Sequence, residues 1–284
     1  MENTLARWRE RFRSELASLY EPREADALFF IFMQALEGLD KPAYFMDPSR
    51  KVVSDKWGRV LQRLARGEPW QYITGRTEFD GLTLEVNPSV LIPRPETEEL
   101  LQWIMEETAV PPARILDVGT GSGALALALR KRFPQAEVWA MDISAEALET
   151  ARQNARRHGL DVKFWQGDMR QGDFPPGPWD LIVSNPPYVL PSERGDMHSN
   201  VKDFEPGMAL FVPQDDPVVF YRHIVRYFIS AARPGSRLYF EINPLTKDRL
   251  AKLFEDHGVQ ARFRRDTAGR WRMAAVRVSP GSSF

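Results

Sequence analysis

The chain contains no cysteine in its 284 residues. That absence excludes a disulfide framework, a thiolate zinc site and a cysteine nucleophile, and it fits a reducing compartment. Histidine is also scarce, and the spacing of the few that occur matches no metal site, so we expect no bound metal. The four histidines are His158, His198, His223 and His257.

Long apolar runs are absent too. None approaches the roughly 18–20 residues that a helix needs to span a bilayer, so we expect no membrane segment. The first residues are rich in arginine, as in a transit peptide, but Glu2, Glu10 and Glu15 argue against one, and the stretch has no signal-peptide core. We therefore expect a cytoplasmic protein.

The chain also lacks an excess of positive charge. Its formal net charge is −1, whereas proteins that bind along a nucleic-acid backbone depend on several phosphate-neutralising cations. We therefore expect no direct contact with nucleic acid. The hydrophobic content of 43% is enough for a substantial core, and the length allows one large domain and one smaller one. We expect the protein to be a monomer.

Residues 1–75 have the pattern of a small helical bundle. Apolar residues recur at helical spacing in three stretches, over residues 5–19, 25–39 and 53–64. The 12 Lys/Arg and 11 Asp/Glu of this region are mixed, so it does not form a basic platform. The pattern is compatible with a packing scaffold and with a module that docks a partner protein.

Residues 76–90 follow a different period. Apolar residues from Phe79 to Val86 alternate with polar ones around Asp80-Gly81, which predicts a β-hairpin. We expect this hairpin to connect the helical bundle with a large domain at residues 91–284.

Strands and helices alternate through the large domain. This alternation, closed by an antiparallel pair, predicts a doubly wound α/β fold. Residues 189–215 contain several prolines and glycines and are predicted to be irregular, and a loop that long in a compact domain is usually functional or disordered. We expect strands over residues 114–118, 137–142, 162–169, 181–183, 237–242, 259–265 and 271–278, and helices over 98–108, 124–132, 145–158, 218–232 and 245–257.

A glycine-rich turn follows the first of these strands. It reads Gly119-Thr120-Gly121-Ser122-Gly123 and leads into a helix, so backbone N–H groups and a close backbone approach are available to a ligand. The spacing matches neither a Walker loop nor the dinucleotide motif G-x-G-x-x-G. Asp142 ends the next strand, 19 residues past Gly123, where a carboxylate accepts the ribose hydroxyls of nucleoside ligands. Its alternative role is to cap the following helix, although Ser144 is the better cap.

The third strand of the domain also ends in an acid. Asp168 follows Gly167, and Met169 comes next. In a parallel sheet the carboxyl ends of the strands lie at one edge, so Asp168 is a candidate acceptor for an adenine amino group, with Met169 beside the ring.

The fourth strand stops abruptly at Asn185-Pro186-Pro187-Tyr188. Two successive prolines cannot donate to a sheet ladder, and Pro186 forces Asn185 into an extended conformation. The Asn185 amide oxygen and the Pro186 carbonyl are two acceptors that suit the hydrogens of a planar NH2 group, and Tyr188 suits its flat face. The plain alternative is an ordinary proline turn at the end of a strand.

These motifs resemble those of a known enzyme class. The loop from Asp117 to Gly123 together with Asp142 is similar to the cofactor loop and ribose acid of class I S-adenosylmethionine methyltransferases, which have a Rossmann-like sheet. The Asn-Pro-Pro-Tyr sequence resembles the signature of the branch that methylates amino groups, and nucleobase and glutamine methyltransferases share it.

Other stretches of the chain resemble the PrmC/HemK family. The similarity extends from about residue 60 to the C-terminus, and the helical N-terminal region fits as well. It is carried by Gly67–Gly75, Phe79–Leu82, Leu91–Glu98, Phe204–Pro206 and Ala209–Phe211. Family members methylate the side-chain amide of the glutamine in the Gly-Gly-Gln loop of class I peptide chain release factors, so the resemblance implies that activity and a docking role for residues 1–75.

The resemblance also implies a set of site residues. S-adenosylmethionine, released as S-adenosylhomocysteine, would be bound by Gly119, Thr120, Gly121, Ser122, Gly123, Asp142, Ile143, Asp168, Met169, Asn185 and Thr97. Substrate binding and catalysis would fall to Asn185, Pro186, Pro187 and Tyr188. Two positions depart from the family pattern: Met169 stands where tryptophan is frequent, which implies weaker stacking, and Asn243 stands where glycine is usual.

Two rival functions are weighed against this one. An adenine N6 methyltransferase would need a basic groove and space for a flipped base, which the near-neutral charge does not favour. A non-catalytic scaffold with the same fold would not need the intact glycines, Asp142 or Asn185.

Overall fold

The computed structural model describes residues 3–278 and contains two compact units. Unit 1 takes in the chain up to Gly75 together with His198–Phe204, and unit 2 takes in Arg76–Met197 and the chain from Glu205 onward. The predicted hairpin is present and belongs to unit 2, where Leu82 and Leu84 enter a hydrophobic core. Within the described residues, no helix has the length and apolarity needed to cross a bilayer.

Unit 1 is built around aromatic side chains. Trp57 stacks on Phe29 with ring centroids 5.4 Å apart, and Phe12 meets both rings edge-on. Burial of such large rings is the main stabilising contribution in a small helical unit. Its helices are α1 (Leu5–Glu15), α2 (Pro22–Glu37), α3 (Lys41–Met46), α4 (Ser54–Ala65), α5 (Trp70–Thr74) and α9 (Ser199–Phe204).

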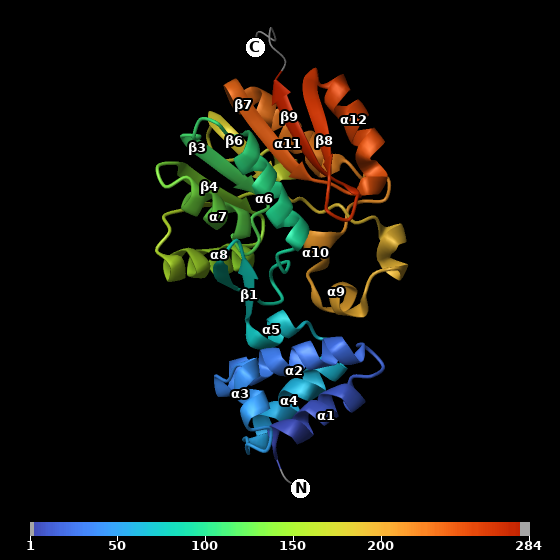
Figure 1. The fold of residues 1–284 in the computed structure, drawn as a ribbon. Coiled ribbons are helices and arrows are strands. Elements are labelled where there is room, and N and C mark those ends of the chain that lie inside the picture. The colour runs from blue at the N-terminus through green and yellow to red at the C-terminus, as the bar shows by residue number, and fades with distance from the viewer. Residues whose placement is uncertain (1–2, 279–284) are drawn as a thin grey trace. The chain divides into compact units, whose positions relative to one another are not determined.

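Unit 2 contains a seven-stranded sheet in the order β5-β4-β3-β6-β7-β9-β8 (Figure 1). The first five strands of this order are parallel, and β9 runs antiparallel to both neighbours. The strands are β3 (Arg114–Val118), β4 (Glu137–Asp142), β5 (Lys163–Gln166), β6 (Trp179–Ser184), β7 (Ala232–Glu241), β8 (Val259–Arg265) and β9 (Trp271–Val278), and β1 (Arg76–Phe79) with β2 (Leu82–Glu85) forms the separate hairpin.

Helices cover both faces of this sheet. Alternate residues of each buried strand enter different cores, because side chains on a strand point to opposite faces: Ile115 packs with α6 and α7, and Leu116 packs with α11 and α12. The predicted doubly wound fold with an antiparallel C-terminal hairpin is therefore confirmed. The helices are α6 (Pro95–Glu107), α7 (Ala124–Arg132) and α8 (Ala145–His158) on one face, and α11 (Val219–Ala231) and α12 (Lys247–Asp256) on the other.

Several sequence-based boundaries were wrong. The predicted strand over 162–169 ends at Gln166, because the Asp168 side chain accepts from the Arg170 backbone N–H and starts a 3-10 turn, η1 (Met169–Gln171). The segment predicted as irregular contains η2 (Pro191–Gly195), α9 and α10 (Gly207–Leu210). A last 3-10 turn, η3 (Pro244–Thr246), precedes α12.

Candidate active site

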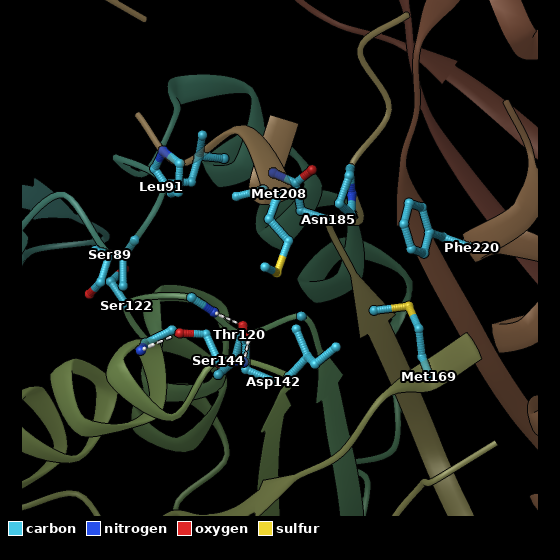
Figure 2. A pocket seen from close by; sticks show the side chains of 18 of the residues that line it. Ser89, Leu91, Thr120, Ser122, Asp142, Ser144, Met169, Asn185, Met208 and Phe220 are labelled. Carbon is cyan, nitrogen blue, oxygen red and sulfur yellow. Dashed lines mark hydrogen bonds between the residues drawn. The ribbon is translucent and has the colours of Figure 1, made fainter. Parts of the chain in front are cut away.

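A cavity of about 670 Å³ opens in unit 2 at the carboxyl ends of β3, β4 and β6 (Figure 2). That is the edge at which ligands bind in open α/β sheets. Of the predicted site residues, those that line the cavity are Thr97, Gly119, Thr120, Gly121, Ser122, Asp142, Ile143, Asp168, Met169, Asn185 and Pro187. Apolar walls are added by Val90, Leu91, Pro93, Pro206, Met208, Ala209, Phe211, Val212, Pro213 and Phe220.

The glycine-rich turn forms the floor of the cavity. Gly119 and Gly121 have φ angles of +75° and +55°, a region that costs other residues roughly 1–2 kcal/mol. A Cβ on Gly119 would lie 3.8 Å from the Met169 Cε, on the cavity side of the loop. The glycines therefore allow the turn itself and keep its surface open to a ligand.

Two carboxylates hold this turn in place. Asp117 Oδ2 accepts hydrogen bonds from the Thr120 hydroxyl (2.6 Å) and the Ala126 N–H (3.1 Å). Asp142 Oδ2 accepts from the Gly121 N–H at 2.9 Å. Each bond ties the loop to the end of a sheet strand, so the loop is ordered by the same strands that surround the cavity.

Gly123 has a different role from the one expected of it. It does not line the cavity, and a Cβ there would lie 3.1 Å from the Ala151 Cβ and 3.3 Å from the Leu127 Cδ1. Its φ of +85° starts α7 in a left-handed conformation. Gly123 thus lets α7 and α8 pack closely, and its contribution to a ligand site is indirect.

Asp142 connects the glycine-rich turn with the start of α8. Its Oδ1 accepts from the Ser144 N–H (3.0 Å), while Ser144 itself caps α8 through the Ala147 N–H (3.1 Å). Burial raises the pKa of Asp142, and the backbone N–H bonds oppose that rise. Both carboxylate oxygens accept backbone N–H groups, and Asp142 lines the cavity, where a carboxylate can also accept ligand hydroxyls.

Asp168 and Met169 lie together at the rim. Asp168 pairs with Arg170 at 3.3 Å, and all three residues line the cavity. In Figure 2, Met169 and Phe220 lie together on one side of the cavity. These two side chains offer an apolar surface to a flat ring. The sequence predicted that Met169 lies beside an adenine ring.

The Asn185 corner forms the opposite wall from the glycine-rich turn (Figure 2). Ser184 fastens the end of β6 to β3 by donating to the Val118 carbonyl at 2.6 Å. Asn185 is half-buried and lines the cavity, as does Pro187. Pro186 and Tyr188 are not among the lining residues, and the Tyr188 hydroxyl donates to Glu241 at 2.7 Å.

Thr97 reaches the corner from the first turn of α6. It is 5% exposed and lines the cavity. Its hydroxyl accepts from the Asn185 Nδ2 (3.2 Å) and donates to the Glu241 Oε2 (2.7 Å). Thr97 therefore contacts Asn185 directly.

Comparison with solved structures supports the fold. A family model described as "Methyltransferase domain" matches residues 115–203. A methyltransferase from Pyrococcus furiosus aligns with a TM-score of 0.53 and 19% identity, over 79% of this chain and 98% of that one. A ribosomal protein L11 methylase from Lactobacillus delbrueckii subsp. bulgaricus aligns with a TM-score of 0.50 and 22% identity, over 69% and 84% of the two chains.

Curated relatives match nearly the whole chain. The release factor glutamine methyltransferase of Flavobacterium psychrophilum is 37% identical over 95% of this chain and 97% of its own, and that of Bacteroides thetaiotaomicron is 42% identical over 86% and 88%. The same-named protein of Deinococcus radiodurans is 39% identical over 88% and 90%. The chain belongs to the release factor glutamine methyltransferase family. The predicted resemblance to PrmC/HemK proteins is thereby confirmed.

Two buried carboxylates that bond to cavity-lining residues were not named as candidates from the sequence. Glu241, at the end of β7, is fully buried and accepts from Thr97 and Tyr188. Glu205 is 5% exposed, accepts from the Ile92 N–H (3.1 Å) and pairs with Arg94 (2.5 Å). The sequence offered one signal for each: Glu241 ends an apolar strand, and Glu205 stands beside a proline. A carboxylate that is buried is rarely left unpaired, so a glutamate in an apolar strand indicates a partner.

Asn243, where the family pattern has glycine, is accommodated by hydrogen bonds. Its Nδ2 donates to the Tyr188 carbonyl (3.0 Å) and to Glu193 (2.6 Å), and its Oδ1 accepts from the Leu245 N–H (2.9 Å). The departure therefore adds a brace behind the Asn185 corner in this methyltransferase.

The charge around the cavity is negative. Asp117, Asp142, Glu146 and Asp168 line it, whereas its two arginines are both paired with carboxylates. Asp117 is completely buried, and burial raises its pKa to about 7 although Thr120 and Ala126 bond to it. Its second oxygen, Oδ1, has no hydrogen-bond partner among the described residues. Such a lining favours a cationic ligand over a polyanion.

Proposed function

We propose that this protein transfers a methyl group from S-adenosylmethionine to the side-chain amide nitrogen of the glutamine in the Gly-Gly-Gln loop of a peptide chain release factor. The observation that carries the proposal is the position of Asn185. Its side chain lines the same cavity as the glycine-rich turn, in a chain that matches named release factor glutamine methyltransferases over almost their full length. An amide acceptor would thus lie beside the bound cofactor.

The residues around the cavity fit S-adenosylmethionine. The glycine-rich turn, Asp142 and Met169 would hold the nucleoside, and the unpartnered Asp117 oxygen suits the positive charge of the methionine end. When bound, this cofactor supplies a methyl group from a positively charged sulfonium. Among the described residues no cluster of His, Cys, Asp or Glu is arranged to hold a metal ion, and the reaction proposed here needs none.

Asn185 would orient the substrate. An amide nitrogen is a weak nucleophile because its lone pair is delocalised into the carbonyl group. Two acceptors on its hydrogens, the Asn185 Oδ1 and the Pro186 carbonyl, would fix its direction and stabilise the positive charge that develops as it is alkylated. Alignment of the reacting atoms contributes up to roughly 7–11 kcal/mol in favourable cases. The alkylated nitrogen is acidic, so solvent can remove its proton and no strong base is needed.

The protein partner follows from the same proposal. A release factor presents glutamine on a loop, and the apolar wall formed by Leu91, Met208 and Phe211 suits a peptide segment better than a phosphate backbone. Unit 1 remains the predicted docking module, and the protein would act as a cytoplasmic monomer without direct nucleic-acid contact.

The decisive experiment uses purified release factor, enzyme and isotopically labelled methyl donor. We expect mass spectrometry to find one added methyl group, located on the Gly-Gly-Gln glutamine. A release factor with that glutamine replaced by alanine is the matched control and should remain unmodified. Label transferred to duplex DNA instead would favour the adenine methyltransferase, and absence of any transfer with retained cofactor binding would overturn the proposal.

A further inference from the structure

Three hydrogen-bonding groups connect the buried end of β7 with the Asn185 corner. Glu241 accepts from the Thr97 hydroxyl at 2.7 Å, and the Thr97 oxygen accepts from the Asn185 Nδ2 at 3.2 Å. The three side chains come from β7, α6 and the end of β6, and Glu241 and Thr97 are both buried. Glu241 is not among the residues that line the cavity, so its effect on a ligand must pass through a neighbour.

The chain of bonds has a fixed direction. A carboxylate has only acceptors, whereas a threonine hydroxyl has a single hydrogen. Thr97 and Tyr188 each donate a hydrogen bond to the Glu241 carboxylate. Once the Thr97 hydrogen is committed to Glu241, the Thr97 oxygen can only accept, and Asn185 must turn its NH2 group toward Thr97.

This direction decides which end of the Asn185 amide faces the substrate. With Nδ2 held by Thr97, the Oδ1 atom is the end left for the cavity. A substrate NH2 group offers two donors, so it requires an acceptor from Asn185, and the reversed amide would oppose donor to donor.

We propose that Glu241 is a positioning residue that, through Thr97, fixes the Asn185 amide with its oxygen toward the substrate nitrogen. This inference rests on the proposed methylation of a glutamine amide. Tyr188 belongs to the same arrangement, because its hydroxyl occupies the second Glu241 oxygen and leaves Thr97 the first. Burial raises the pKa of Glu241, and the hydrogen bonds from Thr97 and Tyr188 together with the positive charge of Arg272, 6.0 Å from the centre of the Tyr188 ring, oppose that rise.

Variants of Glu241 and Thr97 test this chain of hydrogen bonds from Glu241 through Thr97 to Asn185, which we call the relay. In Glu241→Gln the new NH2 group can donate to Thr97 and reverse the chain, so we expect kcat to fall by roughly 10- to 100-fold with KM for release factor and cofactor affinity unchanged. Thr97→Val, of similar shape but without the hydroxyl, should lose a similar factor, and Thr97→Ser should restore it. The double variant Thr97→Val with Glu241→Gln should be no slower than Thr97→Val alone.

The matched control is Tyr221→Phe. Tyr221 is buried and donates to the backbone carbonyl of Glu241 at 3.1 Å, outside the relay, so its loss should leave kcat unchanged. Additive losses in the double variant would mean that Glu241 acts independently of Thr97 and would overturn the relay, as would a Glu241→Gln enzyme with normal kcat.

A spectroscopic readout separates failure of the relay from failure of the proposed function. With asparagine labelled with 15N, the Asn185 side-chain NH2 should show slow hydrogen exchange in the wild type and faster exchange in Thr97→Val and Glu241→Gln. The signal is assigned by its absence in Asn185→Asp. If the wild type does not methylate release factor, this measurement still decides whether Glu241 orients Asn185. Identical exchange in all three proteins would overturn the relay even in an active enzyme.

Discussion

The two walls of the cavity are stabilised in different ways. The glycine-rich turn is held by Asp117 and Asp142 through bonds between residues 3, 9 and 21 positions apart. The Asn185 corner is held through Thr97, Glu241 and Tyr188 by bonds between residues 88, 144 and 53 positions apart. The bonds at the turn need only β3, α7 and β4, which are consecutive in the chain, whereas the corner also needs α6, β6 and β7.

This difference separates ligand binding from catalysis. The turn offers backbone groups and carboxylates that would contact the nucleoside, so changes there should weaken cofactor affinity. The corner offers one amide whose direction matters, so changes there should reduce turnover. Variants of the two walls test whether affinity and turnover separate in this way.

Removal of the Asn185 side chain should have the largest effect on turnover. Asn185→Ala deletes the acceptor that faces the substrate amide, and loss of one such group costs roughly 10²–10³-fold in kcat. Cofactor affinity should stay near the wild-type value, because the turn and its carboxylates are intact. Initial-rate assays with release factor measure kcat, and calorimetric titration measures cofactor affinity.

The control for this variant is Asn3→Ala, an exposed asparagine in unit 1. It should match the wild type in both measurements. A parallel fall of cofactor affinity and kcat in Asn185→Ala would show that the two walls are not functionally separate.

The Asp117 carboxyl should make the stability of the free protein depend on pH. Burial raises its pKa to about 7, so between its unfolded value and pH 7 the folded state holds a proton that the unfolded state has lost. Stability from this group is therefore present at low pH and is lost as pH rises toward 7. Asp117→Asn cannot titrate, so its stability relative to the wild type should rise by about 2–3 kcal/mol between pH 5 and pH 8.

Urea unfolding at the two pH values, without cofactor, measures this change. The comparison is between two proteins at each pH, so titration of other groups cancels to a first approximation. An unchanged difference between the variant and the wild type would mean that Asp117 is already ionised at pH 5 in the folded protein.

Parts of the site that depend on residues close together in the sequence could be predicted, and parts that depend on distant residues could not. The helices over 124–132 and 145–158 were predicted with correct ends, because Ser144 caps one of them and Gly159 ends it in a left-handed conformation. Asp142 and Asn185 could be chosen because each stands at the end of a strand that is recognisable by itself. Glu241 could not be connected with Asn185, since nothing in the sequence shows that β7 lies beside β6 and that α6 crosses their ends.

Short elements were missed for a related reason. α10 has four residues and α9 has six, too few for a helical period to be recognised among prolines and glycines. The close packing of Gly123 could not be predicted either, because its neighbour Ala151 belongs to a helix that packs on α7 only in the folded domain.

Asp142 should control affinity with little effect on turnover at saturation. Asp142→Ala removes the acceptor for the Gly121 N–H and the predicted acceptor for the ribose. Loss of a charge-assisted bond costs about 1.5–3 kcal/mol, so we expect the cofactor to bind roughly 10- to 100-fold more weakly. Asp161→Ala, an exposed aspartate after α8, is the control. If kcat at saturating cofactor falls as far as it does in Asn185→Ala, the assignment of the two walls is wrong.

The smallest effect concerns packing behind the turn. Gly123→Ala and Gly159→Ala both place a Cβ at a positive φ, but only at Gly123 does that Cβ meet neighbours, at 3.1 and 3.3 Å, whereas nothing lies within 4 Å at Gly159. The shared backbone strain cancels when the two variants are compared. The extra crowding should make Gly123→Ala less stable than Gly159→Ala by about 1–2 kcal/mol in urea unfolding. Equal losses would show that α8 moves away from α7 at little cost, and close packing at Gly123 would then add little to the order of the turn.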